Sequence, residues 1–132
     1  MTSSLFRLVC GPAVLTTAPE GWATEMLRDG EVAIVPDADG LTSVHAVARA
    51  LDATTVAVVR GEADDAAQER TVQAHAGTLA LVWVAPGFSD EARAWAQKRA
   101  PMTLLIDADG ALPPDERRRV ERFVAILSGQ AA

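Results

Sequence analysis

Two acidic sequences of the same type each follow a run of apolar residues. They are Asp37-Ala38-Asp39-Gly40 and Asp107-Ala108-Asp109-Gly110. One loop with two carboxylates could present both to a single phosphate, as in metal-assisted phosphoryl transfer. Asp and Gly after a strand are also ordinary turn chemistry, because both tolerate the backbone conformations that turns need. We favour the turn interpretation for both sequences.

The second of these sequences has a known counterpart. Residues 104–112 (LLIDADGAL) resemble the first motif of haloacid-dehalogenase-like phosphatases. The resemblance implies a nucleophilic aspartate at the end of a strand and an acid/base aspartate two residues later, near Mg²⁺. That motif begins its domain, whereas only about 20 residues follow it here. A response-regulator-like acidic pocket would need a lysine on the last strand, but the sole lysine, Lys98, lies on a predicted helix.

Other site signatures are missing from the sequence. There is no G-x-G-x-x-G or Walker loop to bind nucleotide phosphates. Cys10 is the sole cysteine, so the chain can form neither an internal disulfide nor a cysteine zinc cluster. His45 and His75 have no metal-ligand companions, and Ser89 has no nucleophile-elbow context. We predict no metal site and no cofactor.

Composition and charge exclude several classes of function for this protein. The chain has 132 residues, of which 49% are apolar, and a formal net charge of −6. Nucleic-acid-binding domains usually have a basic face, whereas the only arginine cluster, at 117–119 and 122, is interleaved with acids. No apolar stretch approaches the ~18 residues of a membrane span, and the N-terminus lacks a signal peptide. We expect a cytoplasmic protein of bacterial composition, without a membrane or nucleic-acid partner.

Apolar patterns predict the elements that would position these residues. We predict strands at 31–35, 54–59, 78–85 and 102–106, and helices at 21–28, 64–76, 89–99 and 113–128. Strands that alternate with helices indicate a largely parallel sheet covered on both faces. Trp83 and Trp95 lie on buried patterns, so we expect both to be substantially buried.

We predict a single α/β domain over residues 1–132. Residues 1–20 form a poorly defined lead-in, residues 22–112 the core, and residues 113–128 a C-terminal helix.

The segment Thr42–Leu51 decides between two folds. Its residues alternate as in a strand, but Val44, Val47 and Leu51 also fit helical spacing, and its alanines favour a helix. The short link to Thr54 suits a hairpin as well as a helix-to-strand loop.

Residues 87–96 (GFSDEARAWA), 102–107 (MTLLID) and Leu112 resemble the second half of the Mrr-type restriction endonuclease domain. The upstream order of elements fits over residues 22–112. The resemblance implies a three-layer α/β/α fold with a mixed central sheet. It also implies an antiparallel hairpin of residues 43–50 and 54–60, so we favour the strand for Thr42–Leu51.

The resemblance fails at the catalytic positions. The family carries an Asp on one hairpin strand and an acid-x-Lys triplet on the next, which bind Mg²⁺. Here Ser43 or Val44 replaces the Asp, and Val58-Val59-Arg60 replaces the triplet. Arginine stays protonated and cannot act as a general base. Asp37, Asp39 and Glu62 are the nearest carboxylates that could take over.

We therefore expect no catalytic residues, and Mg²⁺ only if nuclease activity is retained. The first hypothesis is a non-catalytic restriction-endonuclease-like module that serves as an interaction or structural domain, with a protein partner or a second copy. An active metal-dependent nuclease is a less favoured alternative.

The second hypothesis is a Rossmann-like or flavodoxin-like domain with a parallel sheet. Such a domain would bind a small anionic ligand where the strands end, with Asp37, Arg60, Glu62 and Asp107 around the crevice. A continuous helix from Ser43 to Leu51 would make this crevice the leading hypothesis.

Overall fold

The computed structural model describes residues 4–37 and 40–130. They form strands that alternate with helices, as the apolar patterns predicted. In chain order the elements are β1 (Phe6–Cys10), α1 (Ala13–Thr16), α2 (Trp22–Met26), β2 (Gly30–Ile34), α3 (Leu41–Ala50), β3 (Ala57–Val58), α4 (Asp65–Ala76), β4 (Ala80–Ala85), α5 (Asp90–Lys98), β5 (Thr103–Asp107) and α6 (Pro114–Gln130).

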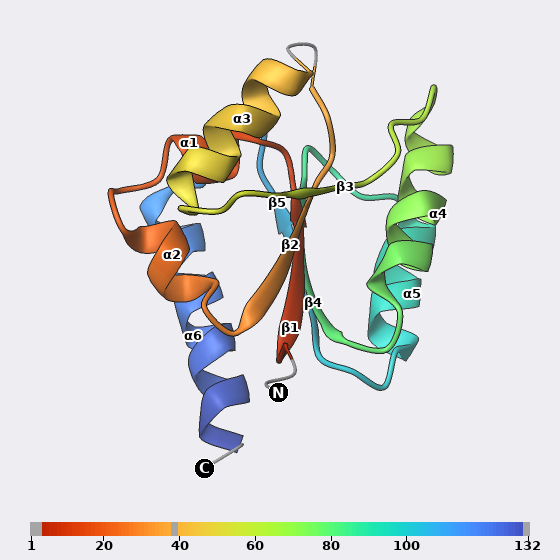
Figure 1. The fold of residues 1–132 in the computed structure, drawn as a ribbon. Helices are drawn as coiled ribbons and strands as arrows, with labels where there is room; N and C mark the ends of the chain where they lie inside the picture. Colours follow the sequence, from red (N-terminus) through yellow and green to blue (C-terminus); the bar gives the residue numbers. More distant parts are fainter. Residues whose placement is uncertain (1–3, 38–39, 131–132) are drawn as a thin grey trace.

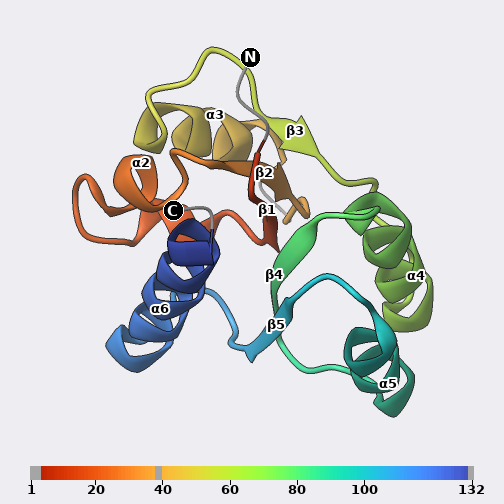
Figure 2. The ribbon, with the colours of Figure 1, turned by 90° about the horizontal axis from the view of Figure 1, so that it is seen from below.

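The described strands form one five-stranded sheet in the order β3-β2-β1-β4-β5. Each neighbouring pair is parallel, with Val9 opposite both Ala33 and Trp83 across the centre. Helices α1, α2, α3 and α6 cover one face, and α4 and α5 cover the other, so the fold has three layers (Figures 1 and 2). The predicted α/β/α class is confirmed, but the sheet is parallel at every described pairing, where we had expected a mixed sheet.

The predicted hairpin is wrong. Residues 43–50 lie within α3, and β2 and β3 on either side of this helix pair in parallel. Val47 is fully buried against the sheet, while His45 and Arg49 face solvent. The amphipathic helical spacing and the alanines therefore prevail over the alternation. The strand expected at 54–59 is reduced to Ala57–Val58.

The expectation of a poorly defined lead-in at 1–20 is also wrong for the described residues. Phe6–Cys10 is the central strand β1, hydrogen-bonded to β2 on one side and β4 on the other. Its side chains alternate between two separate cores. Phe6, Leu8 and Cys10 join the core under α1, α2, α3 and α6, and Val9 joins the core under α4 and α5. Burial on both faces explains why β1 is apolar at every position except Arg7.

β4 has the same double burial, as its uninterrupted apolar run predicted. Val82 and Val84 face one core, and Leu81 and Trp83 face the other. Trp83 is 2% exposed, which confirms the expectation for this residue. Trp95 on α5 is only half-buried. Its ring packs edge-on against the Trp83 ring, with the two ring centroids 6.1 Å apart. Among the described helices, none combines the length and apolarity that crossing a membrane would require.

Candidate ligand-binding crevice

The strand order places a change of direction between β1 and β4. From β1 the chain continues to β2 and β3 on one side, and it then returns to β4 and β5 on the other. The loops that leave β1 and β4 therefore diverge to opposite faces of the sheet. In open parallel sheets, ligands bind in the crevice at this point, outside the carboxyl ends of the strands.

A cavity of about 1090 Å³ opens at this point. Gly11 and Pro12 line it after β1, and the loop 86–89 lines it after β4. One side of α4 forms the opposite wall, with Asp65, Glu69 and Val72 at helical spacing. The cavity thus lies between α4 and the switch point, by which we mean the carboxyl ends of β1 and β4 where the chain changes direction. Helix α4 is on the right-hand side of the sheet in Figure 1.

The backbone at Gly11 confirms that the space is open. A Cβ atom added at Gly11 would meet no heavy atom within 4 Å, and this glycine is not in the left-handed region. Because Gly11 lines the cavity, a side chain at this position would have room beside it at the carboxyl end of β1. A second, smaller cavity of about 290 Å³ lies elsewhere, between α2 and the edge strand β3.

Glu62 occupies one end of the crevice in a network of hydrogen bonds. Its carboxylate accepts from Arg60 at 3.0 and 3.2 Å and from the Thr71 hydroxyl at 3.1 Å. The Gln68 side chain bridges the same loop, since its oxygen accepts from the Glu62 backbone N–H and its amide donates to the Arg60 carbonyl. These bonds hold Glu62 against α4, so its side chain is only 17% exposed.

The loop after β4 is fixed by the start of α5. Ser89 caps this helix, with its hydroxyl oxygen accepting from the Ala92 backbone N–H at 3.1 Å. Phe88 packs edge-on against Trp83, with ring centroids 4.9 Å apart. An aromatic pair from β4 and its loop therefore borders the cavity.

Charge in the crevice is strongly acidic. Among the described residues that line it, one guanidinium, Arg70, accompanies six carboxylates: Asp37, Glu62, Asp64, Asp65, Glu69 and Glu91. They are spread along the walls. In the described part of the chain, no three His, Cys, Asp or Glu side chains come close enough to hold a metal ion.

The structure brings together two of the predicted site residues. Asp37 and Glu62 both line the cavity, and Asp37 accepts a hydrogen bond from Ser43 at 3.0 Å. Arg60 pairs with Glu62, but its side chain is 77% exposed and does not line the cavity. Asp107 lies exposed at the end of β5, outside the lining. Asp39 lies outside the described residues.

Sequence reasoning missed the residues around the switch point. Gly11-Pro12 after the mostly apolar residues 5–10 was a signal of a strand end, but only the pairing of β1 with β4 brings it to Phe88 and Ser89. Cys10 adjoins this loop, yet it is fully buried, and burial raises the pKa of its thiol to about 12.

Comparison with known protein families, curated proteins and solved structures finds no match to this chain.

Proposed function

We propose that this protein is a Rossmann-like domain that binds a small molecule in the crevice between α4 and the switch point. The cavity of about 1090 Å³ at that place carries the proposal. Small-molecule sites are typically concave and occupy roughly 300–1,000 Å³, with a few polar groups among apolar and aromatic walls. The crevice matches this description, with Trp83 and Phe88 beside its polar rim.

The other hypothesis, a non-catalytic restriction-endonuclease-like module, stays a prediction. The hairpin that it implied is replaced by α3, so the crevice supports the ligand-binding function better. The proposal concerns binding, and we assign no catalytic role to the residues that line the cavity.

Filling the cavity tests the proposal. Gly11→Leu would place a side chain in open space without left-handed backbone strain. Gly129→Leu is the matched control, because a Cβ there also meets nothing within 4 Å but the residue lies near the end of α6. A library of small fragments of positive, neutral and negative charge would be screened against ¹⁵N-labelled protein by amide chemical shifts.

We expect fragments to move the amide resonances of Gly87, Ser89 and Asp65, which all line the cavity. Gly11→Leu should abolish these shifts, while Gly129→Leu should keep them. The proposal fails if no fragment moves these resonances, or if the shifts gather instead at Leu27 and Val56 in the smaller cavity.

A further inference from the structure

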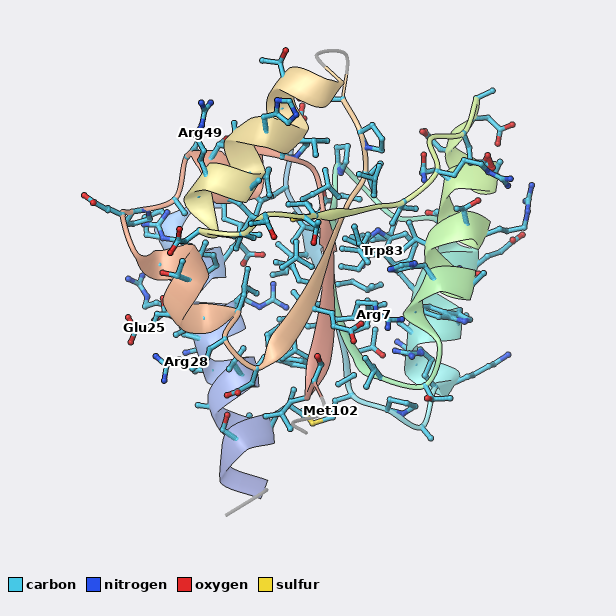
Figure 3. The ribbon with its side chains drawn as sticks, in the orientation of Figure 1. Arg7, Glu25, Arg28, Arg49, Trp83 and Met102 are labelled. Atoms are coloured by element: carbon cyan, nitrogen blue, oxygen red, sulfur yellow. The ribbon has the colours of Figure 1, made fainter. Side chains whose placement is uncertain are left out.

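Trp83 brings a donor without a protein acceptor to the crevice. Its side chain is 2% exposed and lines the cavity, and Figure 3 shows it on the side of the sheet that α4 and α5 cover. Its indole N–H has no hydrogen-bond acceptor among residues 4–37 and 40–130. In the free protein only solvent can accept from this N–H, so a ligand that brings an oxygen acceptor gains a hydrogen bond there.

The indole N–H keeps a small opening to free space. In the described part of the chain, every fully shielded side-chain nitrogen or oxygen atom has a hydrogen-bond partner. The Trp83 nitrogen lacks a partner and is therefore not fully shielded. Phe88 and Trp95 contact the Trp83 ring edge-on, and Trp83 also lines the cavity, which is therefore an open space that this side chain reaches.

The carboxylates of the crevice differ in what they already bind. Glu62 accepts from Arg60 and Thr71, and Glu69 accepts from Ser89. Asp65 and Glu91 have no side-chain partner among the described residues. These two stand in the first turns of α4 and α5, on either side of the cavity.

We propose that the ligand of the crevice is a small organic cation, an amine or guanidinium compound, that also carries a neutral oxygen acceptor. The oxygen accepts the Trp83 indole N–H, and Asp65 and Glu91 balance the positive charge. This inference rests on the proposed ligand-binding function and names the chemical class of the ligand.

Charge argues against the anionic ligand that the sequence predicted. Six carboxylates and one guanidinium line the crevice, and a cleft lined by one sign of charge concentrates ligands of the opposite sign. The first turns of α4 and α5 would attract an anion, but Asp64, Asp65 and Glu91 already supply negative charge there.

The test uses probes that differ in charge. Glucosamine and argininamide are the cations, N-acetylglucosamine is the neutral analogue, and glucuronate is the anion. The readout is the Trp83 indole ¹H–¹⁵N resonance, which is assigned by its loss in Trp83→Phe. We expect at least one cation to move this resonance saturably, and the neutral and anionic probes to require about tenfold higher concentrations or to have no effect.

Variants then test whether the carboxylates of the crevice contribute to the affinity for the cation. Glu91→Gln and Asp65→Asn should each raise the Kd of the bound cation about threefold, and added salt should weaken binding. Glu25→Gln is the matched control, because Glu25 is exposed on α2, on the opposite side of the sheet (Figure 3), and it should leave the Kd unchanged. In Trp83→Phe, binding is followed at the Gly87 amide, and affinity should fall.

Other binding results would contradict the cation proposal. If glucuronate binds more tightly than the cations, or N-acetylglucosamine binds as tightly as glucosamine, the cation proposal is wrong while the crevice still binds ligands. If none of the four probes moves the Trp83 resonance, the cation proposal is also overturned. The fragment screen with Gly11→Leu then decides separately whether the crevice binds any small molecule.

Discussion

The carboxylate of Glu69 on α4 accepts two hydrogen bonds from Ser89, one from the backbone N–H at 2.9 Å and one from the Ser89 hydroxyl group. The two residues are 20 positions apart in sequence, and their contact joins α4 to the loop that precedes α5. Because the Ser89 hydroxyl oxygen also caps α5, one side chain links the two helices that cover this face of the sheet. Both residues line the crevice, so this contact fixes the shape of its mouth.

Ser89→Ala should therefore lower the free energy of unfolding by about 1–2 kcal/mol, the upper part of the range for loss of an N-cap. The variant loses both the cap of α5 and the hydroxyl contact to Glu69. Urea unfolding followed by circular dichroism measures the change. Ser128→Ala, at an exposed position of α6, should change it by less than about 0.5 kcal/mol. Equal effects of the two substitutions would contradict the role of Ser89.

The two tryptophans that meet edge-on should differ in their contribution to stability. Trp83→Ala should cost about 3–5 kcal/mol, because it empties a site in the core. Trp95→Ala should cost clearly less, because this ring is only half-buried, even though the variant also loses the contact with the Arg99 guanidinium, whose carbon lies 4.9 Å from the ring centroid. Unfolding followed by circular dichroism compares the two variants. A smaller loss for Trp83 than for Trp95 would disagree with the burial on β4.

Cys10 should be chemically inert in the folded protein. Burial raises the pKa of its thiol to about 12, so at pH 8 only about one part in ten thousand is ionised, and the thiolate is the reactive form. Ellman's reagent should label the native protein only as fast as it unfolds, and it should label the chain at once in urea. Rapid labelling of native protein at pH 8 would show that the end of β1 is accessible.

The ion pair between Arg7 on β1 and Glu31 on β2 should make stability depend on acid pH. The Arg7 guanidinium donates to Glu31, with Nε at 3.0 Å from Oε2, and it holds the pKa of this carboxyl below its ordinary value of 4.5. Because the pKa of Glu31 is lower in the folded state than in the unfolded state, its ionisation stabilises the folded protein at pH values above the unfolded-state pKa. This contribution to the free energy of unfolding is lost as the pH falls through the folded-state pKa.

Glu31→Gln should therefore destabilise the protein more at pH 7 than at pH 3, as measured by urea unfolding at both values. In an Arg7→Met background the same substitution should show a much smaller difference between the two pH values, because the guanidinium that contributes most to lowering the pKa of Glu31 is gone. A pH-independent effect of Glu31→Gln in the natural background would mean that Arg7 does not stabilise the ionised carboxylate.

Much of the fold could be predicted from local patterns. The apolar run around Trp83 indicated a strand covered on both faces, and Ser89 with acids after it indicated the start of a helix; both are confirmed. The secondary structure of the segment around Val47 could not be decided in this way, because its apolar residues fit both the alternation of a strand and the spacing of a helix. Its burial against the sheet selected the helix, since only one of its faces is apolar.

The sequence by itself therefore determined the alternation of strands and helices, the sheet covered on both faces, and the acidic charge of the protein, whereas the parallel pairing of β2 with β3 was decided by the tertiary structure. The first three properties depend on side-chain periodicity and composition within short segments. The tertiary structure alone decided that Phe6–Cys10 is the central strand and that Gly11, Glu69 and Trp83 meet at one crevice. The physical reason is that strand order depends on the packing of residues distant in sequence, and the position of the crevice follows from that order.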